Sequence, residues 1–311
     1  MKIFNYKYLI LISTLLFIGC SSDDVVVENG NVELSYSISN FDINTPFTRA
    51  THIGTPAEQQ IDNLFLFLFD MGGANPIKYF VDNSFPISSG TWNKVYEKVT
   101  IKLTQSEVGT RQVYVVANVS TALEATFNGV TTLAGLQTAM ESTDTPWSTT
   151  LKTPILMSGF NSSHNFVTYR STLVSLTRVL AKVELNITLP PKHQDTDPLQ
   201  YKYNFIDFDK NSYVLKPTLT KADVLATSGW QDWQATGDVF SYTKGIDDKV
   251  NTLKVVTYIN ERDIAGSYID IQLPFNDGGP LPPPEFGNET FKLPLPGKIE
   301  RNHWYKFDVE L

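Results

Sequence analysis

The chain has 311 residues, which is enough for one large domain or two medium ones with a well-buried core. Its 33 acidic residues outnumber 25 basic ones, and the net charge of −8 argues against a nucleic-acid partner, which requires a basic face. The single cysteine excludes a disulfide within the chain and a zinc site built on cysteines.

The first residues have the pattern of an export signal. Lys2 and Lys7 give a positive start, and a largely apolar run follows at Leu9–Ile18. This run is too short for a transmembrane helix, which needs about 20 apolar residues, but it has the size of a signal-peptide core. Gly19 and Cys20 come directly after it. A small residue before a cysteine at this place resembles the lipobox of bacterial lipoproteins, which implies that residues 1–19 are removed and Cys20 is acylated.

Residues 20–30 form an acidic tether between this signal and the body of the chain. The stretch Ser21–Asp24 resembles the surface-export tag of some Gram-negative lipoproteins, which implies an outer membrane lipoprotein that is exposed on the cell surface. The alternative is a solvated linker. Acyl chains bury enough apolar surface to hold a protein on a bilayer, so the membrane is an expected partner through Cys20.

The first half of the body, residues 31–190, has the patterns of short strands. Residues 32–38 alternate between apolar and polar, the period of a half-buried strand. The apolar runs at 64–69 and 111–117 indicate strands covered on both faces. Leucine spacing at 132–140 predicts one short helix. The longest alternation, at 179–189, predicts a strand with one buried face and one face in water, which also carries Arg178 and Lys182.

Residues 190–199 are polar and contain prolines, which cannot donate to a strand ladder, so we place the border between two domains there. The second domain spans 198–311, and its strand candidates are 201–208, 253–259, 268–273 and 303–311. Many short strands with few helices predict an all-β protein of two β-sandwich domains with one or two short helices.

Residues that carry chemistry are sparse. The four histidines have no second ligand at a metal-binding spacing, and the paired glycines lack the spacing of a phosphate-binding loop. The chain is therefore predicted not to be an enzyme and to need no metal or cofactor. Trp230 and Trp233 could instead form an aromatic platform for a glycan, which makes a surface glycan-binding lipoprotein the alternative function.

Several local motifs occur in a fixed order behind the lipobox. They are Thr48-Arg49-Ala50, Ile61-Asp62-Asn63-Leu64, Val113–Asn118, Leu156-Met157-Ser158-Gly159, Arg178–Val183 and Arg301-Asn302-His303-Trp304-Tyr305. This order resembles the fimbrillin family, the lipoprotein-derived type V pilins of Gram-negative surfaces. The resemblance implies two transthyretin-like β-sandwich domains and a structural role in a fimbrium that supports adhesion. Its implied partners are other pilus subunits and host or bacterial surface ligands.

The resemblance also implies a mode of assembly. A trypsin-like protease would cut between Arg49 and Ala50, and a first strand would leave its groove. The side chains of that strand would be Val32, Leu34, Tyr36 and Ile38. A strand from a neighbouring subunit would then fill the groove by β-strand exchange.

The end of the chain bears on the position in the fimbrium. Shaft members of the family usually continue beyond the last strand with a donor segment, whereas this sequence stops at Leu311. The donor role would then fall to Tyr305, Phe307, Val309 and Leu311. We therefore expect an anchor or accessory subunit slightly more than a shaft subunit, and an anchor would keep its lipid and stay uncut after Arg49.

Overall fold

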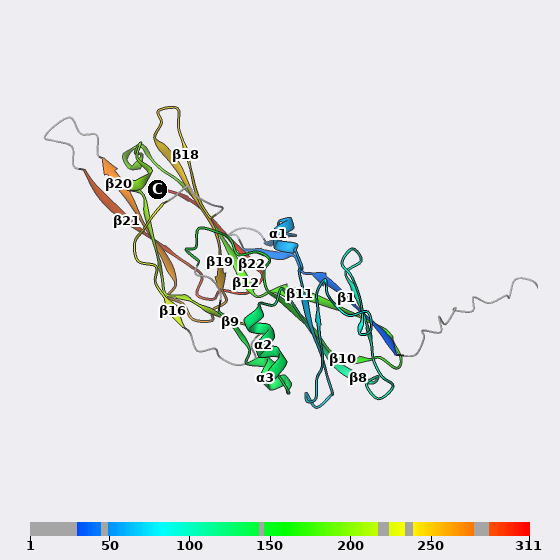
Figure 1. Ribbon diagram of the computed structural model, residues 1–311. Helices are drawn as coiled ribbons and strands as arrows, with labels where there is room; N and C mark the ends of the chain where they lie inside the picture. The colour runs from blue at the N-terminus through cyan, green and yellow to red at the C-terminus, as the bar shows by residue number, and fades with distance from the viewer. Residues whose placement is uncertain (1–29, 45–48, 143–145, 217–223, 234–238, 277–285) are drawn as a thin grey trace, which may run out of the picture.

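The computed structural model describes residues 30–44, 49–142, 146–216, 224–233, 239–276 and 286–311. The described chain is almost entirely β, as predicted, and forms two lobes end to end in an elongated molecule (Figure 1). Its α-helices are short and number three: α1 (Pro56–Gln59), α2 (Thr121–Gly129) and α3 (Leu133–Gln137). No helix in the described ranges is long and apolar enough to cross a membrane.

The first lobe is built on a sheet of eight strands. They are β1 (Asn31–Ile38), β4 (Leu64–Phe69), β5 (Ile77–Val81), β6 (Gly90–Asn93), β7 (Lys98–Lys102), β8 (Thr110–Ala117), β10 (Met157–Asn165) and β11 (Ser171–Arg178). Their order in the sheet is β5-β4-β8-β10-β11-β1-β7-β6. Strands from both halves of this order share one apolar cluster, so the sheet curls around its own core.

The apolar run of β4 is buried on both faces, as its composition predicts. Leu64, Leu66 and Leu68 face the core inside the curled sheet. Phe65 and Phe67 face the opposite way, into a second cluster that α2 and α3 cover. A sheet face covered by helices explains why this strand has no polar alternation.

The two larger helices begin at side-chain caps. Ser120 caps α2 by accepting a hydrogen bond from the N–H of Leu123, and Thr132 caps α3 by accepting one from Gly135. The helix predicted at 132–140 is therefore confirmed, although it ends at Gln137. Helices α1 and α2 were not predicted from the sequence.

The second lobe packs a six-stranded sheet against a four-stranded one. The larger sheet contains β2 (Phe41–Asn44), β3 (Arg49–His52), β12 (Leu180–Thr188), β18 (Phe240–Lys244), β19 (Val250–Asn260) and β22 (His303–Glu310), in the order β18-β19-β12-β22-β2-β3. The smaller contains β13 (Lys202–Ile206), β17 (Gln231–Asp232), β20 (Tyr268–Asn276) and β21 (Phe286–Pro294), in the order β17-β13-β20-β21. Two short pairs complete the fold: β9 (Met140–Ser142) with β15 (Asn211–Tyr213), and β14 (Phe208–Asp209) with β16 (Leu225–Ala226).

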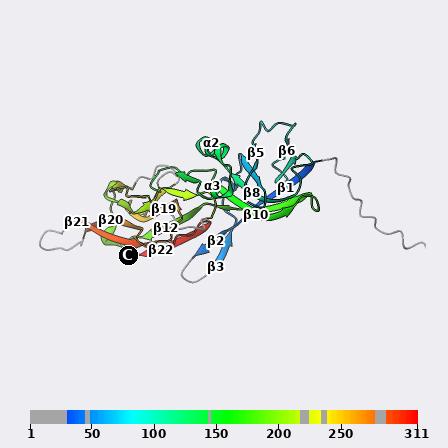
Figure 2. The ribbon, with the colours of Figure 1, turned by 90° about the horizontal axis from the view of Figure 1, so that it is seen from below.

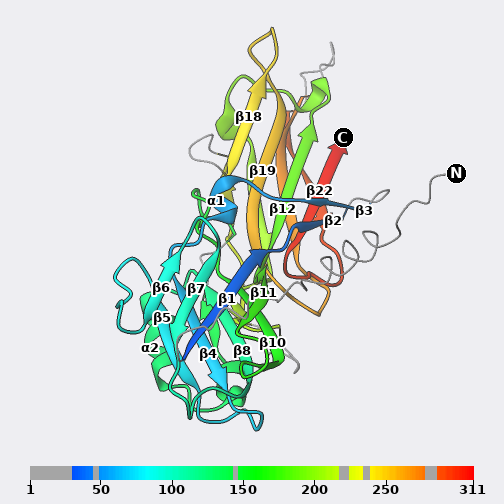
Figure 3. The same ribbon diagram turned by 90° about the vertical axis from the view of Figure 1, so that its right-hand side faces the viewer.

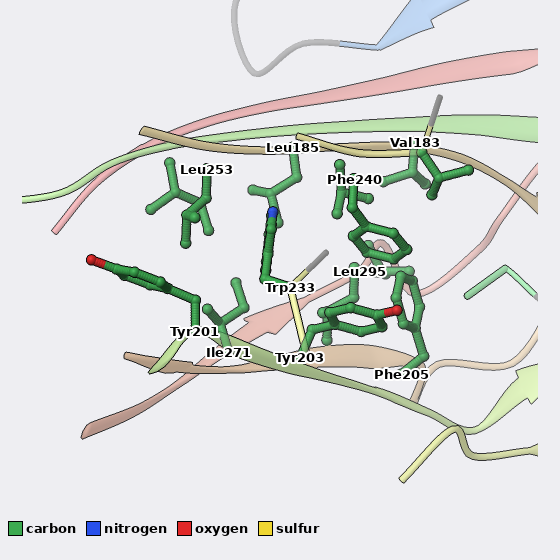
Figure 4. Close-up of a cluster of buried hydrophobic side chains, with 14 of the residues drawn as sticks. Val183, Leu185, Tyr201, Tyr203, Phe205, Trp233, Phe240, Leu253, Ile271 and Leu295 are labelled. Atoms are coloured by element: carbon green, nitrogen blue, oxygen red, sulfur yellow. The ribbon is translucent and has the colours of Figure 1, made fainter. Parts of the chain in front are cut away.

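An aromatic core fills the space between these two sheets. Figure 4 shows Tyr203 and Phe205 of β13 pointing toward Val183 and Leu185 of β12, with Trp233 between the layers. Tyr203 stacks on Phe240 with ring centroids 4.1 Å apart. Such contacts add to the large apolar area that each ring buries.

Strand β12 belongs by pairing to the second lobe, because it lies between β19 and β22 and contributes to the second core. The chain thus passes from one sheet to the other between Arg178 and Leu180, ahead of the proline-bearing stretch 190–199. Strands β2 and β3 also lie in the second lobe, although they directly follow β1 of the first.

Two extended segments therefore cross the junction between the lobes. Strand β1 pairs in parallel with β11, and the chain continues from them into β2 and β12 on the other side. Figure 3 shows β1 and β11 side by side below the junction, with β12 and β22 above it. Figure 2 shows that β1 begins at one end of the molecule and that β22 ends near the other.

Candidate functional site: the first strand and the domain junction

Strand β1 occupies the interior of the first sheet. Six of its residues pair with β11 and five pair with β7. Val32, Leu34 and Tyr36 are 1%, 2% and 5% exposed, and Ile38 packs partly buried against the same cluster. The hydroxyl of Tyr36 accepts a hydrogen bond of 3.0 Å from the indole N–H of Trp92.

The slot that holds β1 has the properties of a strand-binding groove. Without β1, both β7 and β11 would have an unpaired backbone edge, and the apolar cluster beneath would be open to water. Each fully buried Val or Leu side chain contributes about 1.5–3 kcal/mol. A vacant slot would therefore bind another strand with the same alternation.

The Arg49–Ala50 bond lies at the start of β3, an edge strand. β3 pairs only with β2 among the described strands, in a register that joins Asn44 to Arg49 and Ile43 to Ala50. Ala50 is exposed. Residues 45–48, including Thr48 of the predicted cleavage motif, lie outside the described residues, as does Cys20.

Strand β22 packs within its own sheet. Tyr305 is 4% exposed, and Phe307, Val309 and Leu311 pack partly buried against the second core. β22 pairs in parallel with β12 from Trp304 to Glu310 and with β2 only from His303 to Tyr305. Among the described strands, its other edge has no partner from Lys306 onward, so β22 ends as a partly open edge.

A group of buried charged side chains lies where the two lobes meet, beneath the segment that joins β1 to β4. Arg178 has no exposed surface, and its guanidinium lies 4.0 Å from the ring of Phe41. Lys182 is 5% exposed and forms an ion pair of 2.8 Å with Glu58, which is 1% exposed. Buried charges are tolerated only when they are paired and hydrogen-bonded, so this junction is a specified contact.

Glu58 has three hydrogen-bond donors. Its Oε1 accepts from Lys182 and, at 2.7 Å, from the hydroxyl of Tyr258, while its Oε2 accepts from the N–H of Thr55 at 2.6 Å. Burial acts to raise the pKa of Glu58, but these donors outweigh it and hold the pKa below its ordinary value. Glu58 is therefore the anion that neutralises the buried Lys182.

A cleft of about 540 Å³ opens beside this cluster, lined by both lobes and by the chain around β2. Asp42 and Thr51 form part of its wall, together with Phe160 of β10 and His303 of β22. Because Asp42 and Thr51 lie on opposite sides of the Arg49–Ala50 bond, the wall would change if the N-terminal segment left.

The chain is similar to fimbrial subunits over nearly its whole length. Residues 33–200 match the family described as major fimbrial subunit protein (FimA), and residues 179–310 match the C-terminal family of minor fimbrium tip subunit MfA4. A minor fimbrium tip subunit MfA4 of Porphyromonas gingivalis is 41% identical over 335 residues, covering 98% of this chain and 99% of that protein. The chain belongs to the fimbrillin family.

Solved structures agree with this fold. A Bacteroides eggerthii protein described as a cell adhesion protein has a TM-score of 0.56 at 16% identity. The match covers 91% of this fimbrillin and 87% of that chain. The tip fimbrial protein Mfa3 of Porphyromonas gingivalis, with a C-terminal truncation, has a TM-score of 0.53 at 13% identity, covering 90% and 95%. At these identities the likeness shows the shared β fold.

As a fimbrillin, the chain is a structural subunit of a fimbrium, where it contacts other subunits at the cell surface. The predicted glycan platform is wrong, because Trp233 is 1% exposed in the second core, while Trp230 is 43% exposed. The tryptophan pair therefore does not share a surface.

The most buried part of the fimbrillin junction was not predicted from the sequence. The alternation predicts Arg178 and Lys182 on a strand face in water, whereas Arg178 is 0% and Lys182 5% exposed. The segment from β2 to α1 covers that face, and alternation along one strand cannot show that a distant segment folds over it. Lys182 directly faces Trp304 in the register of β12 and β22, a pairing that no local sequence pattern reports.

Proposed function

We propose that this fimbrillin is an accessory subunit of a type V fimbrium, positioned at or near its tip rather than along its shaft. The observation that carries this proposal is the 41% identity with a minor fimbrium tip subunit over 98% of the chain. The alignment spans 99% of that relative, so both lobes and their connection are included.

Export follows the lipoprotein route in this proposal. Residues 1–19 are removed as a signal peptide, Cys20 is acylated, and the acidic tether at 20–30 directs the chain to the outer face of the outer membrane. The sequence Gly19-Cys20 behind the apolar run Leu9–Ile18 supports this step.

Assembly follows from the place of β1. A cut between Arg49 and Ala50 separates β1 and β2 from the body, and a strand of another subunit takes their place. The alternation of buried side chains in β1 and the edge position of β3 support this step. We assign the donor strand of this chain to β22, whose residues 305–311 carry the same alternation.

The proposed role is structural and adhesive, without a catalytic step or cofactor. Its partners are the neighbouring fimbrial subunits and, at an exposed tip position, ligands on host or bacterial surfaces. The tip position supports the second kind of partner, because a terminal subunit leaves one face uncovered.

The test is the N-terminus and mass of the mature protein purified from sheared fimbriae and from outer membranes. A subunit that has exchanged its first strand begins at Ala50 and carries no lipid. We expect such chains in the fimbrial fraction. Labelling of this subunit on intact fimbriae should place it mainly at fibre ends.

An acylated chain that begins at Cys20 and remains with the membrane would instead assign an anchor role. A protein recovered only as a monomer, never with fimbriae, would refute the proposal.

A further inference from the structure

Arg178 is held from both sides of the Arg49–Ala50 bond. Upstream of the bond, the carbonyl of Ser39 accepts a hydrogen bond of 2.7 Å from Nη1, and the ring of Phe41 lies 4.0 Å from the guanidinium carbon. Downstream, the carbonyls of Ile53 and Glu58 accept from Nη2 and Nε, each at 3.1 Å. Cleavage would divide these partners into two groups.

Only the upstream group would leave with the first strand. The carbonyls of Ile53 and Glu58 belong to the body of the subunit and would keep the guanidinium in place, facing the vacated slot. Asn302, whose Oδ1 accepts from Nη1 at 3.1 Å, would also stay. A buried cation that loses some of its partners is costly, so the vacant slot favours a segment that replaces them.

Asn302 also sets the register of the resident segment. Its side-chain amide donates to the carbonyl of Asn40 at 2.5 Å, and its own carbonyl accepts from the N–H of Asp42 at 3.0 Å. These two bonds hold the backbone on either side of Phe41, so its ring falls on the face of Arg178. Phe41 has no exposed surface and also contacts Trp304 edge to face.

We infer that Arg178 selects the segment that enters the junction by requiring an aromatic ring at the place of Phe41. The partner is an extended segment of another fimbrial subunit, with three alternating apolar residues in the β1 slot and an aromatic residue five positions after the last of them, as Phe41 follows Tyr36. This inference rests on the strand exchange of the proposed function and adds the chemistry that decides which strand is accepted.

An aromatic ring is required because of its interaction with the cation. The negative face of an aromatic ring attracts a guanidinium, and the attraction is stronger in a buried site than in water. A leucine would fill much of the same space without that attraction. The rival explanation is that the apolar alternation of β1 alone decides which strand binds.

The experiment uses the chain from residue 20 onward, with a site-specific protease sequence built into residues 45–49. After one cut, excess synthetic peptides corresponding to residues 30–44 compete to replace the resident strand, and native mass spectrometry measures their incorporation. The peptides carry phenylalanine, leucine or pentafluorophenylalanine at position 41. The matched control is Ile43→Leu, which changes an aliphatic side chain whose residue pairs with Trp304.

The pentafluoro ring has the shape of phenylalanine, is slightly larger and is more apolar, but its quadrupole is reversed, so it repels a cation. We expect this peptide to bind about threefold to thirtyfold more weakly than the natural one, and the Phe41→Leu peptide to bind more weakly as well. The Ile43→Leu control should stay within about twofold. In an Arg178→Met chain the preference for the natural ring over the pentafluoro ring should vanish.

The outcomes separate the inference from the function on which it rests. Incorporation of all peptides with equal affinity would overturn the role of Arg178 while leaving strand exchange intact. Failure of every peptide to enter the cut chain would refute strand exchange itself, and the inference with it. The comparison of the two rings needs only the unsubstituted Arg178, so it holds even if Arg178→Met fails to fold.

Discussion

At the scale of single residues, the junction depends on buried charge. Lys182 and Glu58 form a nearly dry ion pair, and Tyr258 donates a third hydrogen bond to the same carboxylate. Removing one member of such a pair leaves the other charge buried without compensation. The pair therefore specifies how the segment before β4 lies on β12 and β19.

Replacing Glu58 by Gln should lower the free energy of unfolding by about 3 kcal/mol at pH 7, because Lys182 loses its counter-charge. The folded-state pKa of Glu58 is held below its unfolded value near 4.5. Its stabilisation is therefore complete above that value and is lost as the pH falls through the lower folded pKa. Urea unfolding of the unsubstituted chain and of Glu58→Gln at pH 7 and at pH 3 measures this. The difference between their free energies of unfolding should be smaller at pH 3.

The control for this change is Glu33→Gln. Glu33 pairs with Lys98 at 2.9 Å on the surface, where the two side chains are 37% and 44% exposed. Exposed pairs contribute about 0–1 kcal/mol, so this substitution should have little effect at either pH. An equal loss in both variants would contradict the assigned role of the buried pair.

At the scale of elements, β1 is a half-buried strand that pairs with a neighbour on each side. Its inner side chains anchor the first core, yet the chain leaves that lobe at Ile38 and continues in the other. The contribution of β1 to the stability of the first lobe therefore comes from a few inward-facing residues. A replacement strand with apolar residues at the same positions could supply the same contacts.

Leu34 and Leu173 offer a direct comparison of an inward and an outward leucine on neighbouring strands. Leu34 of β1 is 2% exposed, whereas Leu173 of β11 is 62% exposed. Leu34→Ala should cost about 2–5 kcal/mol of unfolding free energy by opening a cavity. Leu173→Ala should stay within about 0.5 kcal/mol. Thermal or urea unfolding of the two variants measures this, and similar losses would mean that β1 does not anchor the core.

The sequence predicts the elements whose burial shows in their own residue pattern, and it does not predict those placed by contacts with distant segments. Alternation predicts β1 and the apolar run predicts β4, because each pattern reflects burial beside the strand itself. The position of β12 depends on its pairing with β19 and β22, and the covering of Arg178 depends on Phe41 of β2. All three strands are distant from β12 in the sequence. No local period reports such a contact. The same holds for α1, which is a single turn held in place by Glu58.

At the scale of the whole molecule, the two lobes are joined by strands that run along its length. β1 begins at one end, crosses into β2, and β22 ends near the other end (Figures 1 and 2). If a neighbour replaces β1, its strand must enter along this same line. The elongated shape thus favours end-to-end association.

A covalent link across β1 tests whether its departure is required for incorporation. Glu33 of β1 directly faces Thr100 of β7, so Glu33→Cys with Thr100→Cys places two thiols on paired residues of adjacent strands. The locked chain should reach the cell surface but be absent from sheared fimbriae, and a reducing agent should restore its incorporation.

The control lock joins β12 to β19 through Asn186→Cys with Lys254→Cys, another directly facing pair. Neither strand lies upstream of Arg49, so this lock should leave incorporation unchanged. Fimbriae that accept both locked chains equally well would show that β1 stays in place during assembly.

The direction of β1 also determines how the joint would respond to mechanical force. The hydrogen bonds that hold β1 to β7 and β11 lie across the strand, whereas the strand points along the molecule. Tension applied lengthwise would therefore load all of these bonds at once in shear, and none could open before the others. A sideways force would peel them apart one by one, so a strand seated in this slot resists pulling far better than peeling.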